Sequence, residues 1–93
     1  MFNRVLQRMR EKVRRQQYVM TYHARKEMND DGLTIYDVER GILTGTILER
    51  QRDRVTGEAK YCIRGETIDA LAVEILARLS STGTLVIITV YVP

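Results

Sequence analysis

Residues that form covalent or metal cross-links are scarce in this sequence. Its 93 residues include one cysteine, Cys62, and one histidine, His23. A single cysteine cannot form an internal disulfide, and a structural zinc site needs four cysteine or histidine ligands. The sequence also lacks a phosphate-binding loop, a dinucleotide-binding motif and the ligand spacing of a calcium loop. We therefore expect no disulfide, no metal site and no cofactor.

Proline, tryptophan and long apolar runs are equally rare. The chain has one proline and no tryptophan, and no segment approaches the ~20 apolar residues of a membrane-spanning helix. Hydrophobic residues make up 44% and charged residues 29% of the chain, which is typical of a globular domain. We predict one folded domain over residues 1–93, without membrane contact, in the reducing cytoplasm.

Positive charge is concentrated near the N-terminus. The net charge is only +3, yet residues 1–17 combine six basic side chains with the single acidic Glu11. Apolar residues repeat there with helical spacing, which predicts an amphipathic helix from about Asn3 to Arg15. We predict that its basic stripe binds an acidic partner, either nucleic acid or protein, and the alternative is a solvated helix face. The stripe consists of Arg4, Arg8, Lys12 and Arg15.

Two short helices are predicted within residues 18–45. Residues 18–22 are expected to form an extended link, and residues 23–28 a short helix that stops at the turn before Gly32. The next helix is predicted over residues 35–44, because Thr34 and Asp37 have the spacing of a capping box. We expect Gly45 to end this helix in the left-handed conformation.

The pattern changes to strands after residue 45. Residues 46–52 and 59–65 flank a polar turn and predict a hairpin. Residues 68–79 fit both helical and alternating spacing. We predict a strand there, because the turn at residues 80–83 leads directly into the last strand, which needs an antiparallel neighbour. The last strand is predicted from the β-branched and aromatic residues that precede Pro93.

Side-chain alternation assigns the strand residues to two faces. In the last strand the apolar even positions predict the core face: Val86, Ile88, Val90 and Val92. The opposite face of the sheet is then predicted to collect Lys60, Arg64, Glu74, Arg78, Thr89 and Tyr91. Such a face would offer cations for phosphate beside a carboxylate and a phenol. The alternative is an ordinary solvated face of an antiparallel sheet.

Several short motifs follow one another in a recognisable order. They are Tyr22-His23-Ala24, Gly32-Leu33-Thr34 with Asp37-Val38, Tyr61 with Gly65, and Ile87-Ile88-Thr89-Val90-Tyr91. In this order they resemble an uncharacterised family of small bacterial and cyanobacterial domains placed near the RelE/ParE-type toxins, over about residues 16–92. The resemblance implies an α+β fold in which N-terminal helices pack on an antiparallel sheet of about four strands, residues 46–93. It also implies RNA cleavage without metal and an antitoxin-like partner.

The sequence departs from the family pattern at two places. Many relatives carry Glu-Arg-Gly where this chain has Asp30-Asp31-Gly32. Many also carry a histidine in the third strand, where this chain has Ala72. If these positions serve catalysis in the relatives, this chain has lost the activity or moved it to other residues.

Metal-independent RNA cleavage needs a base for the 2′-hydroxyl proton, cations for the phosphate and an acid for the 5′-oxygen. We predict these catalytic residues: His23, Arg64, Glu74 and Tyr91. We predict these substrate-binding residues: Arg25, Lys60, Arg78 and Thr89. A packing or capping role is the alternative for His23, the only imidazole. Cys62 is interpreted as a small filler without thiol chemistry.

Two functions therefore stay open. The first is a toxin-like domain of a toxin–antitoxin system, a metal-independent endoribonuclease that binds RNA and an antitoxin-like protein. The second is a non-catalytic module that binds a protein or nucleic acid, which the missing third-strand histidine favours. Both leave the oligomeric state open, including a homo-oligomer.

Overall fold

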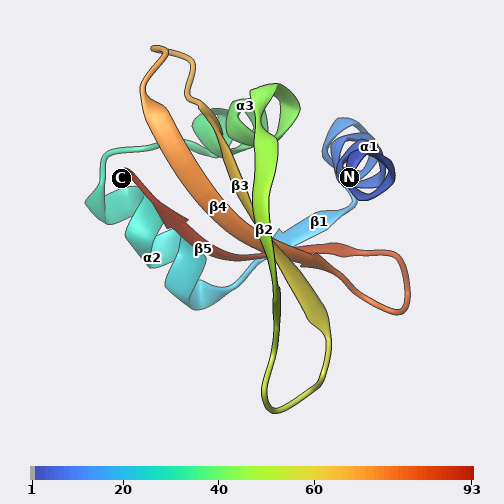
Figure 1. Cartoon of the computed structure of the whole chain (residues 1–93). Coiled ribbons are helices and arrows are strands. Elements are labelled where there is room, and N and C mark those ends of the chain that lie inside the picture. The colour runs from blue at the N-terminus through green and yellow to red at the C-terminus, as the bar shows by residue number, and fades with distance from the viewer. Residues whose placement is uncertain (1) are drawn as a thin grey trace.

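The computed structural model describes residues 2–93 and contains three helices and a five-stranded sheet (Figure 1). In chain order the elements are α1 (Asn3–Arg14), β1 (Tyr18–Met20), α2 (Tyr22–Asp30), α3 (Ile35–Thr44), β2 (Thr46–Arg52), β3 (Ala59–Glu66), β4 (Ala72–Leu79) and β5 (Leu85–Tyr91). The strand order across the sheet is β1-β5-β4-β3-β2. β1 runs parallel to β5, and the other neighbouring pairs are antiparallel. The chain therefore has an α+β fold with a mixed, open sheet.

The predicted first and third helices are confirmed. α1 buries one stripe of apolar side chains and leaves the opposite side to charged residues. α3 begins with the predicted capping box: the Thr34 hydroxyl accepts from the Asp37 amide at 3.3 Å, and the Asp37 carboxylate accepts from the Thr34 amide at 2.9 Å. The hydrogen bond from the Thr34 amide lowers the pKa of Asp37, and the Ile68 amide, which donates to the other carboxylate oxygen at 3.1 Å, acts in the same direction, because both stabilise the charged form.

The second helix is longer than predicted. α2 begins at Tyr22, because the side chain of Thr21 accepts a hydrogen bond from the Ala24 amide and caps the helix. It ends at Asp30, close to Gly32, whose φ of +69° lies in the left-handed region that favours glycine. The predicted glycine stop is therefore correct, and the N-terminal cap was missed.

Residues 18–20 are a strand and not only an extended link. β1 pairs with β5 from Leu85 to Ile87, so the sheet has five strands and is mixed, where four antiparallel strands were expected. Three residues are too few to show an alternation pattern, and the partner strand lies more than sixty residues away along the chain. This strand therefore depends on tertiary pairing, which local sequence does not reveal.

The ambiguous segment is confirmed as a strand over residues 72–79. β4 buries Val73, Ile75 and Ala77 completely and turns the residues between them to the other face. It pairs with β3 on one side and β5 on the other. Residues 68–71 of the predicted segment lie outside the strand, in the turn region that precedes it.

The predicted core positions of the last strand are only partly correct. β5 buries Leu85, Ile87 and Val90, so the core parity changes along the strand. Ile88 has no partner on β4, because the register shifts by one residue at this β-bulge. The bulge reverses which positions face the core. Val86, before the bulge, therefore lies off the core face, whereas Val90, after it, lies on the core face as predicted. Val92 follows the strand and is exposed.

Gly45 does not end α3 in the left-handed conformation. Its φ of −86° and ψ of 175° are extended backbone that any residue adopts. A Cβ atom there would lie 2.5 Å from the carbonyl oxygen of Gly41 and 2.8 Å from that of Arg64. Glycine is therefore required because the chain passes close to α3 and β3, and not because of its φ.

The core lies between the three helices and one face of the sheet. Its fully buried residues include Met9, Val38, Ile42, Ile63, Ile75 and Ile87. Arg10 connects α1 to the C-terminal end of α3: its guanidinium donates hydrogen bonds to the carbonyl of Gly45 at 2.8 Å and to the carbonyl of Ile42 at 3.3 Å. This arginine is therefore a helix-capping residue and not part of the free basic stripe. None of the helices within residues 2–93 has the length and apolarity to cross a membrane.

Candidate functional site

The face of the sheet opposite the helices, called the open face here, carries a cluster of polar residues. Arg64 on β3 pairs with Glu74 on β4, which in turn pairs with Tyr91 on β5. Two residues further along each strand, on the same face, Cys62 pairs with Leu76, and Leu76 pairs with Thr89. The antiparallel register therefore places residues from three strands side by side on one face.

Glu74 is the centre of this cluster. The phenol of Tyr91 donates to its Oε1 at 2.5 Å, and the thiol of Cys62 donates to the same oxygen at 3.6 Å. The guanidinium of Arg64 lies 4.0 Å from the other oxygen, Oε2. The side chain of Glu74 is only 13% exposed, whereas that of Arg64 is 52% exposed. A largely buried carboxylate thus stands beside an accessible cation.

The cluster borders a hollow of about 250 Å³ on the open face. Its lining residues come from four strands: Leu48, Glu49, Gln51, Cys62, Glu74, Leu76, Thr89 and Tyr91. Sequence reasoning missed Glu49. Strict alternation from the partly buried Ile47 would direct Glu49 inward, but a bulge between these residues reverses the parity of β2. Such a bulge has no clear signal in this sequence.

Both donors to Glu74 hold their protons strongly. The hydrogen bond to Glu74 raises the pKa of Tyr91 to about 12, and partial desolvation acts in the same direction. Burial raises the pKa of the Cys62 thiol to about 11, and the hydrogen bond and the charge of Glu74 add to this effect. At neutral pH the cluster therefore contains a neutral phenol and a neutral thiol. The interpretation of Cys62 without thiol chemistry agrees with this pKa.

We expect Cys62 to react slowly with iodoacetamide. A pKa of about 11 leaves roughly one thiol in 10⁴ ionised at pH 7, so the rate should be about 10²-fold below that of a free cysteine. Because the thiolate is the reacting form, the rate should rise about tenfold per pH unit up to about pH 10. Mass spectrometry over this pH range measures the rate, with the protein in urea as the accessible-thiol control. A rate that levels off near pH 8 would contradict the raised pKa.

The other predicted phosphate ligands on the sheet have acidic neighbours. Lys60 forms an ion pair with Asp53 at 3.7 Å, and Arg78 forms one with Glu58 at 2.9 Å. Asp53 belongs to the turn between β2 and β3, where backbone hydrogen bonds from Thr56 and Val55 lower its pKa. The positive charges of Lys60 and Arg78 are therefore partly neutralised by carboxylates of the same chain.

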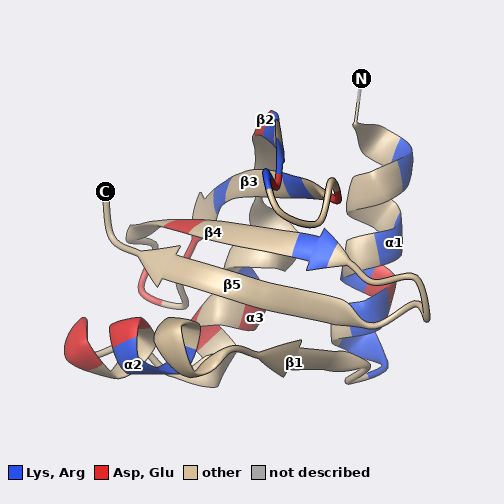
Figure 2. Cartoon of the chain, turned by 90° about the horizontal axis from the view of Figure 1, so that it is seen from below, with Lys and Arg blue, Asp and Glu red and all other residues tan. Residues whose placement is uncertain are grey.

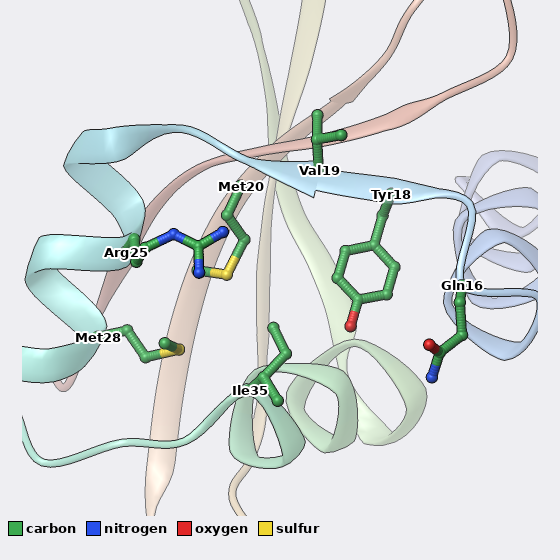
Figure 3. Close-up of a pocket in the computed structure, with 7 residues that line it drawn as sticks. All are labelled: Gln16, Tyr18, Val19, Met20, Arg25, Met28 and Ile35. Atoms are coloured by element: carbon green, nitrogen blue, oxygen red, sulfur yellow. The ribbon is translucent and has the colours of Figure 1, made fainter.

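The structure separates the two predicted residues of α2 from the Glu74 cluster. The side chain of His23 is 68% exposed, and its Nε2 lies 3.2 Å from the carboxylate of Glu27. Glu27 also accepts a hydrogen bond from the Val90 amide at 3.2 Å. Within residues 2–93, neither a hydrogen bond nor an ion pair joins His23 to Glu74. Arg25 lines a different hollow, beside β1 (Figure 3).

The basic stripe of α1 lies on the outside of the molecule, where Lys and Arg mark the helix (Figure 2). Arg4 and Arg8 are exposed, whereas Arg15 is bound to Glu11 at 2.7 Å. Lys12 is half-buried and donates to the side-chain oxygen of Gln17 at 3.3 Å. The stripe is thus a surface feature separate from the open face.

Comparison with known proteins places the chain in a family without giving it an activity. Neither a curated protein nor a solved structure matches it. One family model matches residues 20–92, nearly the same span as the motifs quoted above. The comparisons do not connect this family with the RelE/ParE-type toxins, so that relation stays a prediction. No three metal-ligating side chains gather anywhere in the described part of the chain. The chain belongs to the family described as a domain of unknown function, DUF4258.

Proposed function

We propose that the chain is a toxin-like endoribonuclease of the RelE/ParE kind, which cleaves RNA without metal on the open face of its sheet. The observation that carries this proposal is the position of Glu74 between Arg64 and Tyr91 at the edge of a hollow. A carboxylate, an accessible cation and a protonated phenol are the three groups that this reaction needs. An antitoxin-like protein would then be the partner that controls the activity.

The proposed reaction starts with the 2′-hydroxyl of the substrate RNA. Its proton passes to the Oε2 atom of Glu74 while the 2′-oxygen attacks the phosphorus. Arg64 stabilises the additional negative charge on the phosphate. The bond between phosphorus and the 5′-oxygen breaks, and the phenol of Tyr91 supplies the proton to that oxygen. The products are a 2′,3′-cyclic phosphate and a free 5′-hydroxyl, and Glu74 returns its proton to Tyr91.

The raised pKa of Tyr91, about 12, supports its role as the acid. The phenol stays protonated at pH 7, and an alkoxide leaving group is a stronger base than the phenolate that remains. The proposal needs no imidazole, so His23 is left outside the proposed reaction. Lys60 and Arg78 are the proposed contacts for neighbouring phosphates, and Thr89 is the proposed hydroxyl contact.

The test is an RNA cleavage assay with the full chain in the presence of EDTA. We expect cleavage that EDTA leaves unchanged, products with 2′,3′-cyclic phosphate ends, and a loss of about 10²-fold or more in rate for Arg64→Ala. Thermal unfolding of the variant checks that it remains folded. The absence of cleavage of structured, single-stranded and ribosome-bound RNA would overturn the proposal.

A second function, the non-catalytic interaction module, is favoured by a specific observation. The Oε1 atom of Glu74 already accepts from two donors, and Lys60 and Arg78 have acidic partners. Such a cluster can be a structural hydrogen-bond network on a binding face. Binding of RNA or protein without cleavage, and with the same affinity in Arg64→Ala, would favour this function.

A further inference from the structure

Within residues 2–93, no other segment pairs with the backbone groups on the outer edge of β1. β1 pairs with β5 on one side only and is the last strand of the sheet. The carbonyl of Gln17 accepts from β5 at 3.2 Å, and the amide of Thr21 donates to β5 at 3.0 Å. Because backbone groups alternate in direction along a strand, the amides and carbonyls of Tyr18 and Met20 point to the outer edge. They can therefore pair with one more strand.

The opposite edge of the sheet differs from this one. β2 has a bulge at Leu48 and carries Glu49, Arg50 and Arg52, all of which hinder the addition of a strand. β1 has neither a bulge nor a charged residue (Figure 2), and Val19 at its centre is 53% exposed. The two edges are thus unequal, and only β1 lacks these protective features.

A hollow of about 530 Å³ adjoins the β1 edge on the helix side of the sheet. Figure 3 shows Tyr18 and Met20 extending from β1 towards Ile35 of α3, with Met28 and Arg25 of α2 beside them. The ring of Tyr18 is fixed there by a hydrogen bond from its hydroxyl to Glu39. An added strand would direct alternate side chains to this hollow and to the side of Val19.

Cations lie at both ends of β1. Arg25 is exposed and makes no ion pair or side-chain hydrogen bond with the rest of residues 2–93. At the other end, Lys12 lines a neighbouring hollow together with Gln16 and Gln17. A second copy of the chain is a poor occupant, because pairing β1 with β1 in either direction brings these cations together. An acidic segment complements them.

We propose that the outer edge of β1 binds an extended, acidic segment of a partner protein, which adds to the sheet as a sixth strand. The backbone of this segment pairs with Tyr18 and Met20. One of its carboxylates binds Arg25, and an apolar side chain packs between Met28 and Ile35. This surface is separate from the open face, so the proposal does not depend on RNA cleavage.

The experiment uses a blocked synthetic peptide with threonine at every second position and with valine and glutamate in turn at the positions between, so that one face of the added strand carries both groups. The same peptide with lysine in place of glutamate is the charge control. Fluorescence anisotropy should show saturable binding of the acidic peptide and at least about tenfold weaker binding of the basic one. Amide hydrogen exchange should show new protection at Tyr18 and Met20 in the complex. N-methylation of alternate peptide bonds, which removes the backbone donors, should abolish binding.

The variant Arg25→Glu should weaken binding of the acidic peptide about tenfold and strengthen binding of the basic one. Lys26→Glu is the matched control, because Lys26 is the next residue of α2 and does not line this hollow. It should leave both affinities nearly unchanged. Equal effects of the two substitutions, or no protection at β1 in the complex, would overturn the proposal. Self-association of the chain would also overturn the proposal if it rose with concentration, protected the amides of Tyr18 and Met20, and were not displaced by the acidic peptide.

Discussion

The Glu74→Gln variant is expected to lose RNA cleavage by about 10²- to 10⁴-fold, because the substitution removes the proposed base. An amide of nearly the same shape can still accept the hydrogen bonds of Tyr91 and Cys62 through its oxygen. The fold should therefore remain intact. Initial rates on a labelled RNA, measured with EDTA present, give the effect.

The matched control is Glu66→Gln, which makes the same chemical change at an exposed position at the end of β3. It should keep nearly the full rate. A second readout does not depend on cleavage: loss of the Glu74 charge should lower the pKa of Cys62 from about 11, since that charge disfavours the thiolate. Iodoacetamide labelling at pH 7 should then become faster. Full cleavage by Glu74→Gln together with faster labelling would remove Glu74 from the reaction while confirming its contact with Cys62.

The Gly65→Ala variant is expected to lose roughly 3–5 kcal/mol in the free energy of unfolding, because it forces two backbones apart. A Cβ atom at Gly65 would lie 1.9 Å from the carbonyl oxygen of Gly41 and 2.8 Å from its carbonyl carbon. Both clashes are with the backbone of α3, which cannot move aside as a flexible side chain can. For a domain of this size, such a loss is a large part of the total stability.

Gly32→Ala is the control for this prediction. Gly32 has a φ of +69° and free space around its Cβ position, so alanine there has an unfavourable backbone conformation without a clash. It should cost about 1 kcal/mol. Urea unfolding curves of both variants measure the difference. Equal losses in the two variants would contradict the proposed role of the close contact between α3 and β3.

Much of the fold was predictable because it depends on neighbouring residues. The capping box of Thr34 and Asp37, the apolar stripe of α1 and the hairpin of β2 and β3 have signals within a few residues of one another. The strand at residues 72–79 could also be predicted, but only through the turn that follows it. Local propensity and periodicity are sufficient where the partner is close in sequence.

The candidate site was predictable to a smaller extent. Alternation placed Arg64, Glu74 and Tyr91 on one face, and the register of three strands brings them together. Alternation could not place Glu49 on this face, since the bulge between Ile47 and Glu49 reverses which residues of β2 face the core. Nor could it show that His23 binds Glu27 on α2, because the helix and the sheet have no common register.

The sequence alone determined the α+β class, the three helices and four of the five strands, because caps, turns and periodicity act over short distances. Tertiary structure decided the rest. The parallel pairing of β1 with β5 joins segments more than sixty residues apart, and two bulges alter which residues share a face. The requirement for glycine at positions 45 and 65 arises only when β3 and α3 approach each other. Such contacts depend on packing between distant segments, for which no local pattern in the chain is a signal.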